Sequence, residues 1–224
     1  MMNIKDNLSH IHQQIAYACK QANRDIEQVQ LLAVTKTKPC DLIEQAYLAG
    51  QRQFGESYVQ ESIEKIAALA HLSDIEWHFI GPIQSNKTRA IATNFSWVHS
   101  VDRVKIASRL NEQRCGQDTS LNICLQVNIS DEESKSGVSV DELLTLAQYV
   151  SNCENLTLRG LMAIPDKNAS KTVFDQMFTL YHDLKTKYPT IDTLSMGMSN
   201  DLSLAVQSGS TMVRVGSAIF GQRN

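Results

Sequence analysis

The chain alternates short runs of apolar and β-branched residues with longer segments in which apolar residues recur at helical spacing. Several short runs are almost continuously apolar, which is typical of strands covered on both faces in a parallel sheet. Successive runs start about 18 to 37 residues apart, a spacing that accommodates a strand and a returning helix. The eight runs begin at Leu31, Gln53, Glu76, Trp97, Leu121, Leu156, Thr193 and Thr211.

Eight strand–helix units without a stretch of consecutive strands predict a single (β/α)8 TIM-type barrel rather than an open doubly wound sheet. Helix-ending signals agree with this order, because Gly50 and Pro189 each follow an amphipathic segment. Residues 1–24 form an additional amphipathic segment, which we expect to pack on the barrel as an N-terminal helix. We therefore expect residues 1–224 to form one domain.

Composition and charge narrow the classes of function. The 224 residues are 42% hydrophobic and 20% charged, as in an ordinary globular protein. A formal net charge of -3 argues against nucleic acid as the main partner, because proteins that follow a phosphate backbone present a basic face. The N-terminus lacks the pattern of a signal peptide, and no stretch approaches the ~20 apolar residues of a membrane span. Five scattered cysteines indicate reduced thiols, so we expect a cytoplasmic protein with neither a metal site nor a membrane contact.

Lys36 ends the first predicted strand, in the segment AVTKTKP, and functional residues of such barrels gather at the carboxyl ends of the strands. Two interpretations are open for this lysine. It is either a solvated residue at the rim, as most lysines are, or an amine at the barrel mouth whose pKa is lowered by desolvation. The second environment would make it a Schiff-base nucleophile.

The loops after the seventh and eighth predicted strands have the features of a phosphate site. The seventh strand ends in SMGMSND, whose small polar residues expose backbone amides, and the eighth carries Gly216 and Ser217 near the mouth. Arg214 lies two residues before Gly216 and therefore points to the same side, within reach of a bound ring. Each feature also has a structural interpretation: a helix cap, a packing glycine or a rim ion pair. Together with the first-strand lysine, they form the arrangement that a pyridoxal phosphate (PLP) site needs.

The chain contains, in this order, the segments LLAVTKTKP, GQRQFGESYVQE, EWHFIGPIQSNK, NISDEESKSG, LRGLMAIP, DTLSMGMSND and GSTMVRVGSAIFG. They resemble the signature segments of the pyridoxal phosphate homeostasis proteins (YggS/PROSC type). The resemblance covers the chain from Leu31 to Gly221. It implies the barrel of the alanine racemase N-terminal domain, with the cofactor bound in the fold-type III manner.

The resemblance also implies roles for individual residues. Lys36 would form the Schiff base with PLP, and Ser199, Gly216 and Ser217 would bind the phosphate. Arg214 matches the arginine that alanine racemases place opposite the pyridine nitrogen. An arginine does not give up its proton to the ring, so the ring would stay unprotonated and would be a weaker electron sink than one paired with a carboxylate.

Further positions are candidate contacts at the barrel mouth. His78, Asn86 and Lys87 match another family signature, although helix capping and hydrogen bonding in the core are equal alternatives for them. Ser57 is a departure, because family members commonly have asparagine after the Gly-Glu pair. Serine keeps a donor and an acceptor but has a shorter reach. We expect Ser57, His78 and Asn86 to lie near the cofactor.

Three hypotheses for the function follow. The resemblance implies a protein of intracellular PLP homeostasis, which holds the cofactor without turnover and affects amino-acid and keto-acid metabolism indirectly. The uncovered mouth of a lone barrel is compatible with release of PLP to cofactor-free PLP enzymes, and a lone barrel favours a monomer. The alternative is an amino-acid racemase of the alanine racemase type, whose second base is a tyrosine from a separate β-domain, whereas this chain ends directly after strand eight. A Schiff-base aldolase or isomerase without a cofactor is the third.

Overall fold

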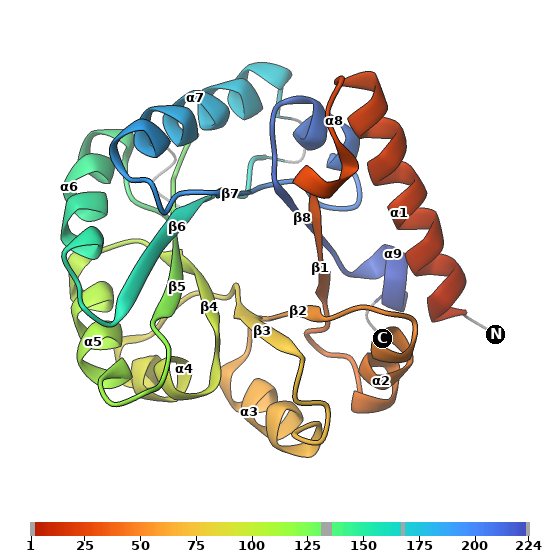
Figure 1. The fold of residues 1–224 in the computed structure, drawn as a ribbon, viewed down its shortest axis with the longest axis horizontal. Helices are drawn as coiled ribbons and strands as arrows, with labels where there is room; N and C mark the ends of the chain where they lie inside the picture. Colours follow the sequence, from red (N-terminus) through yellow and green to blue (C-terminus); the bar gives the residue numbers. More distant parts are fainter. Residues whose placement is uncertain (1–2, 131–135, 167–168, 223–224) are drawn as a thin grey trace.

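Eight parallel strands close into a barrel in the order β1 to β8, and β8 pairs with β1 to complete it (Figure 1). The computed structural model describes residues 3–130, 136–166 and 169–222. The closed barrel confirms the predicted fold class, and each strand begins within one residue of its predicted start. The strands are β1 (Gln30–Val34), β2 (Gln53–Glu56), β3 (Glu76–Phe79), β4 (Trp97–Val101), β5 (Leu121–Gln126), β6 (Leu156–Met162), β7 (Thr193–Ser195) and β8 (Met212–Val215).

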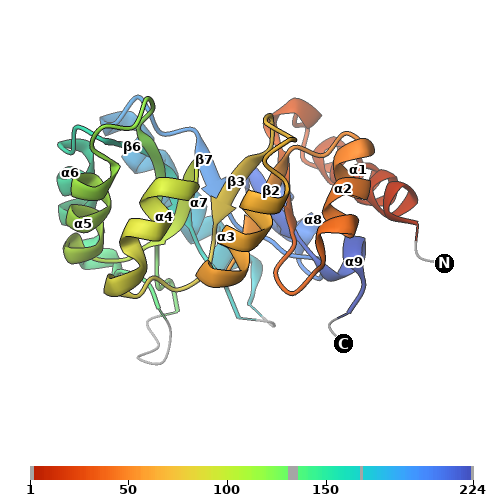
Figure 2. The ribbon, with the colours of Figure 1, turned by 90° about the horizontal axis from the view of Figure 1, so that it is seen from below.

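Helices surround the barrel and cover the outer face of the sheet (Figures 1 and 2). Each strand is followed by a helix, as expected for parallel strands that need a crossover connection. In the described part of the chain, no helix is long and apolar enough to cross a membrane. The helices after the strands are α2 (Cys40–Leu48), α3 (Val59–Ala68), α4 (Thr88–Asn94), α5 (Val104–Arg114), α6 (Val140–Ser151), α7 (Lys171–Lys187), α8 (Leu202–Gln207) and α9 (Ser217–Phe220).

The last strand is shorter than its sequence pattern predicted. The eighth predicted strand includes Gly216 and Ser217, but β8 stops at Val215. Gly216 leaves the extended conformation, with φ -118° and ψ -71°, and the chain turns into the short helix α9. Burial of Ile219 on α9 explains why the segment is apolar. Ser217 consequently begins a helix and is exposed.

The predicted N-terminal helix is present as α1 (Ile4–Gln21) and lies on the outside of the barrel against α8 and α9 (Figure 1). Asn3 caps it by accepting a hydrogen bond from the Asp6 backbone N–H. Its buried side chains recur every three or four positions, which places them along one face. They are Ile4, Leu8, Ile11, Ile15, Ala18 and Cys19.

The interior of the barrel contains polar groups on neighbouring strands. Alternate residues of a strand face the same side, so Glu76 and His78 of β3 lie beside Trp97 and His99 of β4. The rings of His78 and Trp97 stack with their centroids 5.2 Å apart, and the ring of His99 meets His78 edge-on at the same centroid distance. Both histidines are fully buried.

Candidate functional site

A cavity of about 240 Å³ opens at the carboxyl ends of the strands. Its wall combines two amines, a guanidinium, hydroxyl groups, backbone and aliphatic side chains. This is the end of the barrel at which functional residues were expected. The lining residues are Val34, Lys36, Lys38, Ser57, Ile80, Ile164, Met198, Ser199, Arg214, Gly216, Ser217 and Gly221. The structure therefore brings together all five residues predicted to bind the cofactor.

Lys36 is half-buried in the turn that follows β1, and both of its neighbours are fixed. The Thr35 hydroxyl donates to the Glu56 carboxylate over 2.7 Å, and the Thr37 backbone N–H donates to the Glu61 carboxylate over 2.6 Å. Thr37 has a φ of 65°, a left-handed conformation that costs energy for a β-branched residue. These contacts orient the turn that presents Lys36 to the cavity.

Lys65 of α3 also holds this turn in place. Its buried ammonium donates to the Thr35 carbonyl and to Glu56, both over 2.7 Å, and to Glu61 over 2.5 Å. Burial raises the pKa of Glu56, while the charge and hydrogen bond of Lys65 lower it. No sequence pattern predicts this group, because the Glu61–Lys65 spacing is that of an ordinary exposed helix pair. Only the folded chain brings the Glu56 carboxylate into contact with the Lys65 ammonium.

Arg214 projects from β8 into the barrel and is 5% exposed. One terminal nitrogen of its guanidinium donates to the carbonyl and to the hydroxyl of Ser195, over 2.7 and 2.8 Å. The other donates to the Ala163 carbonyl over 2.8 Å. Burial lowers the pKa of Arg214 to about 10, and Asp201 opposes the shift, so the group stays cationic near neutral pH. It offers a fixed donor to the cavity.

Another part of the cavity wall comes from the turns after β7 and β8. Ser199 lies in a turn in which the Met198 backbone N–H donates to the Asp201 carboxylate over 2.5 Å. Gly216 packs against β1, since a Cβ at this position would lie 3.1 Å from the Val34 carbonyl oxygen. Ser199 and Ser217 therefore line the same cavity as Lys36, from the turns after β7 and β8.

These groups fit PLP by their chemistry. A primary amine matches its aldehyde, hydroxyl groups match its phosphate, and a buried donor matches the ring nitrogen. Aliphatic side chains, including Val34 and Ile80, supply surfaces for an aromatic ring.

Comparison with known proteins places this site in a family. The family model for the alanine racemase N-terminal domain matches residues 7–224. A pyridoxal phosphate homeostasis protein of Haemophilus influenzae is 54% identical over 230 residues, covering 100% of this chain and 97% of its own length. The chain belongs to the pyridoxal phosphate homeostasis protein family. The resemblance inferred from the seven sequence segments is thereby confirmed.

Solved structures agree with this membership. PipY of Synechococcus elongatus PCC7942, in a structure with PLP bound, is 36% identical with a TM-score of 0.84, and the match covers 97% of this chain and 100% of PipY. The alanine racemase of Corynebacterium glutamicum shares the fold, with a TM-score of 0.68 at 14% identity, and the match covers 97% of this chain and 61% of the racemase. This chain and the racemase therefore share the same barrel fold.

Of the candidate contacts at the mouth, one lines the cavity and the others do not. Ser57 lines the cavity as expected. Asn86 and Lys87 are exposed in the 3-10 helix η2 (Ser85–Lys87) after β3 and are not among the lining residues. The expected place of His78 at the mouth is corrected: it is fully buried inside the barrel, one residue before the end of β3, and its ring turns toward Glu76 at the start of that strand. Alternation along β3 explains this inward direction.

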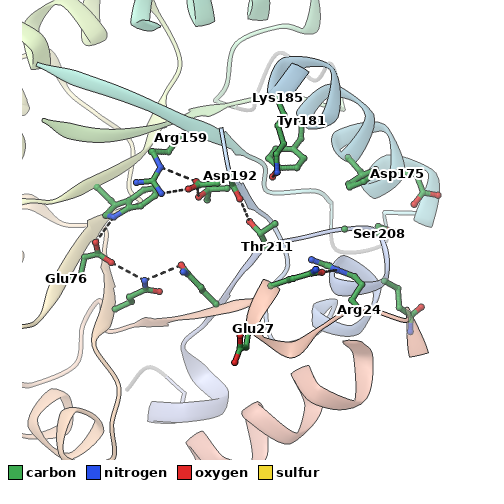
Figure 3. Close-up of a pocket in the computed structure, with 18 residues that line it drawn as sticks. Arg24, Glu27, Glu76, Arg159, Asp175, Tyr181, Lys185, Asp192, Ser208 and Thr211 are labelled. Atoms are coloured by element: carbon green, nitrogen blue, oxygen red, sulfur yellow. Dashed lines mark hydrogen bonds and ion pairs between the residues drawn. The ribbon is translucent and has the colours of Figure 1, made fainter. Parts of the chain in front are cut away.

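A second, larger cavity of about 850 Å³ lies at the opposite end of the barrel, where the strands begin (Figure 3). Arg159 and Asp192 form an ion pair in its wall, and the Arg159 guanidinium lies 4.6 Å from the ring centroid of Trp97. Glu76 also lines it. No sequence pattern predicts this cavity, because its wall is assembled from the starts of most of the strands together with α7 and α8.

Proposed function

We propose that this chain binds PLP in the cavity at the carboxyl ends of the strands and acts in PLP homeostasis. The observation that carries the proposal is the convergence of Lys36, Arg214 and the Ser199–Ser217 hydroxyl pair on one cavity. Membership of the family, and a relative solved with PLP bound at 36% identity over its full length, support it.

Each residue has a distinct part in this proposal. Lys36 would supply the primary amine that holds the cofactor through its aldehyde carbon. Ser199, Gly216 and Ser217 bind the phosphate, with hydroxyl and backbone donors that hold the cofactor against the outer turns. Ser57 lies in the wall beside the Lys36 turn and offers a hydroxyl to the polar edge of the ring.

Arg214 faces the ring nitrogen and limits the chemistry available to the bound cofactor. Its guanidinium is held on Ser195 and Ala163, so it presents only N–H donors. A donor at this place keeps a proton off the ring nitrogen. The ring is then a weaker electron sink than one opposite a carboxylate.

The cavity wall supports a holding role over turnover. Racemisation needs an acid or base on each face of the reacting carbon. Among the described residues that line the cavity, none is Asp, Glu, His, Cys or Tyr. Besides Lys36, the wall has the amine of Lys38, which donates to the Gln222 carbonyl over 2.8 Å. The wall therefore favours a PLP carrier. We propose in addition that it works as a monomer in the cytoplasm and passes the cofactor to cofactor-free PLP enzymes.

Borohydride labelling tests the proposal. Purified protein loaded with PLP is reduced with borohydride, digested and examined by mass spectrometry. We expect the label on the peptide that contains Lys36, and its loss in Lys36→Ala. Lys38→Ala is the matched control, because Lys38 lines the same cavity two residues away, and it keeps the label. Label on Lys38, absence of any label in the folded wild type, or D-alanine formed from L-alanine would contradict the proposal.

A further inference from the structure

A continuous row of hydrogen bonds runs through the interior of the barrel from Arg214 to the opposite end. The Arg214 guanidinium donates to the Ser195 hydroxyl oxygen over 2.8 Å, and that oxygen lies 3.0 Å from Nδ1 of His99. Nε2 of His99 lies 2.9 Å from Nδ1 of His78. Nε2 of His78 lies 3.3 Å from the Glu76 carboxylate. The row connects four strands of the barrel.

The two charged ends determine where every proton in this row lies. Arginine has donors alone, so the Ser195 oxygen accepts from it and the hydroxyl proton of Ser195 stays available for Nδ1 of His99. At the other end, an ionised carboxylate only accepts, so the facing Nε2 of His78 carries a proton. Nδ1 of His78 is then an acceptor for the Nε2 proton of His99. Both histidines are neutral, with the proton on Nε2.

Burial and charge agree with this assignment. Both histidines are fully buried, and burial lowers the pKa of His78 and lowers that of His99 well below its ordinary value. The hydrogen bond from His78 lowers the pKa of Glu76 to about 2, so this carboxylate is ionised at every ordinary pH. The positive field of Arg214 also disfavours a charge on His99.

Glu76 is fixed at the wall of the second cavity (Figure 3). One carboxylate oxygen accepts from the Trp97 indole N–H over 2.8 Å. The other accepts from the Gln53 amide over 3.0 Å, in addition to His78. The carboxylate therefore has a defined position, although it lies at the open end of the barrel away from the mouth.

We propose that Glu76, His78, His99 and Ser195 are positioning residues that hold Arg214 in the orientation facing the cofactor ring. The row gives the guanidinium polarised neutral partners and leaves its own carboxylate at the far end of the barrel. The charge of Asp201 also stabilises the cation. The partners in the row therefore hold the guanidinium without adding a carboxylate beside the ring nitrogen, which would favour protonation of that nitrogen. This inference rests on the proposed binding of PLP at the mouth.

Nitrogen-15 NMR of the cofactor-free protein tests the row without any ligand. We expect the ring signals of His78 and His99 to show a protonated Nε2 and an unprotonated Nδ1 between pH 6 and 8. In Glu76→Gln the side-chain amide both donates and accepts, so the single tautomer is lost at His78. Glu27→Gln is the matched control, because Glu27 lines the same cavity outside the row, and it leaves both signals unchanged. A protonated Nδ1 on either ring of the wild type overturns the proposal.

A double-mutant cycle on PLP affinity tests the link to Arg214. Glu76→Gln and Ser195→Ala act at opposite ends of the row, and we expect each to weaken PLP binding roughly three- to tenfold, as for one lost hydrogen bond. Because both interrupt one row, the double variant is expected to be no weaker than the worse single variant. Additive losses overturn the proposal, as does unchanged affinity in both folded single variants. Failure of the wild type to bind PLP contradicts the proposed function and leaves the NMR result standing.

Discussion

Lys65 joins the helix α3 to the turn that presents Lys36. Its side chain is 7% exposed, and its ammonium contacts Glu56, which is fully buried, and Glu61, which is partly exposed. A buried carboxylate without its cation retains the cost of desolvation, so removal of one partner is more damaging than the net value of the pair. The Thr35 carbonyl, which also accepts from Lys65, transmits the loss to the Lys36 turn.

Lys65→Met is expected to lower the free energy of unfolding by about 3 to 5 kcal/mol, because it leaves the Glu56 carboxylate buried without a cation. Equilibrium denaturation in urea at pH 7 measures this change. Glu61→Gln is the matched control, since it removes the charge of the partly exposed partner and leaves the buried Lys65–Glu56 pair intact, and we expect about 1 kcal/mol or less. Equal losses in the two variants would contradict the role assigned to the buried pair.

Sequence patterns predict the residues that line the mouth but not the residues that keep those side chains in position. Lys36, Arg214 and Gly216 lie at strand ends, where position along a barrel strand is informative on its own. Lys65 and His99 act through partners that are distant in sequence, and no local pattern marks such pairs. His78 was placed at the mouth because its motif was assigned as a unit, whereas alternation along β3 turns this residue toward the barrel axis.

At the scale of elements, periodicity predicted the strand starts closely because both faces of a buried parallel strand are apolar. It predicted too long a strand at β8. The apolar residues of α9 continue the pattern of the strand, although the chain has already turned at Gly216. Local composition does not distinguish a short buried helix from the end of a strand. The amphipathic pattern of residues 1–24, in contrast, predicted the N-terminal helix that is present as α1.

The packing of α1 on α8 and α9 is open to a direct test. Ile11 lies in the middle of its buried face and is 1% exposed. Ile11→Ala is expected to lower the free energy of unfolding by about 2 to 5 kcal/mol, through lost burial and the resulting void. Tyr17→Ala on the same helix is the matched control, since Tyr17 is 64% exposed, and its effect should stay within about 0.5 kcal/mol. A small effect of Ile11→Ala in urea denaturation would mean that α1 contributes little to the stability of the barrel.

At the scale of the whole molecule, the row from Arg214 to Glu76 forms a polar axis inside a mainly apolar barrel. Both ends of the axis are charged, Arg214 toward the mouth and Glu76 toward the second cavity, and neutral groups connect them. Composition does not reveal such an axis, because the residues come from separate strands and each looks like an ordinary strand residue. Its formation requires the closed barrel, so its energetics report on the fold as a whole.

Acidification is therefore expected to destabilise the barrel. His78 and His99 stay neutral in the fold because burial lowers the pKa of each below its ordinary value of 6.5, whereas in the unfolded chain both bind a proton near that pH. The unfolded state then binds more protons below pH 6.5, so the free energy of unfolding falls as the pH is lowered, by up to about 1.4 kcal/mol per pH unit for each histidine. The raised pKa of Glu56 acts in the opposite direction, since the folded state binds that proton more readily.

Urea denaturation of the cofactor-free protein at intervals from pH 8 to pH 5 measures this dependence. His71→Gln is the matched control, because the His71 side chain is 61% exposed, and it should keep the wild-type slope. His99→Gln should reduce the slope, since one neutral buried histidine is gone. Glu76 adds to the loss at lower pH, between its ordinary pKa of 4.5 and its folded value of about 2, because its depressed pKa stabilises the fold only while the carboxylate is ionised. A slope in His99→Gln equal to that of the wild type would show that His99 takes up a proton inside the barrel as readily as in the unfolded chain, and the neutral row from Arg214 to Glu76 would then be wrong.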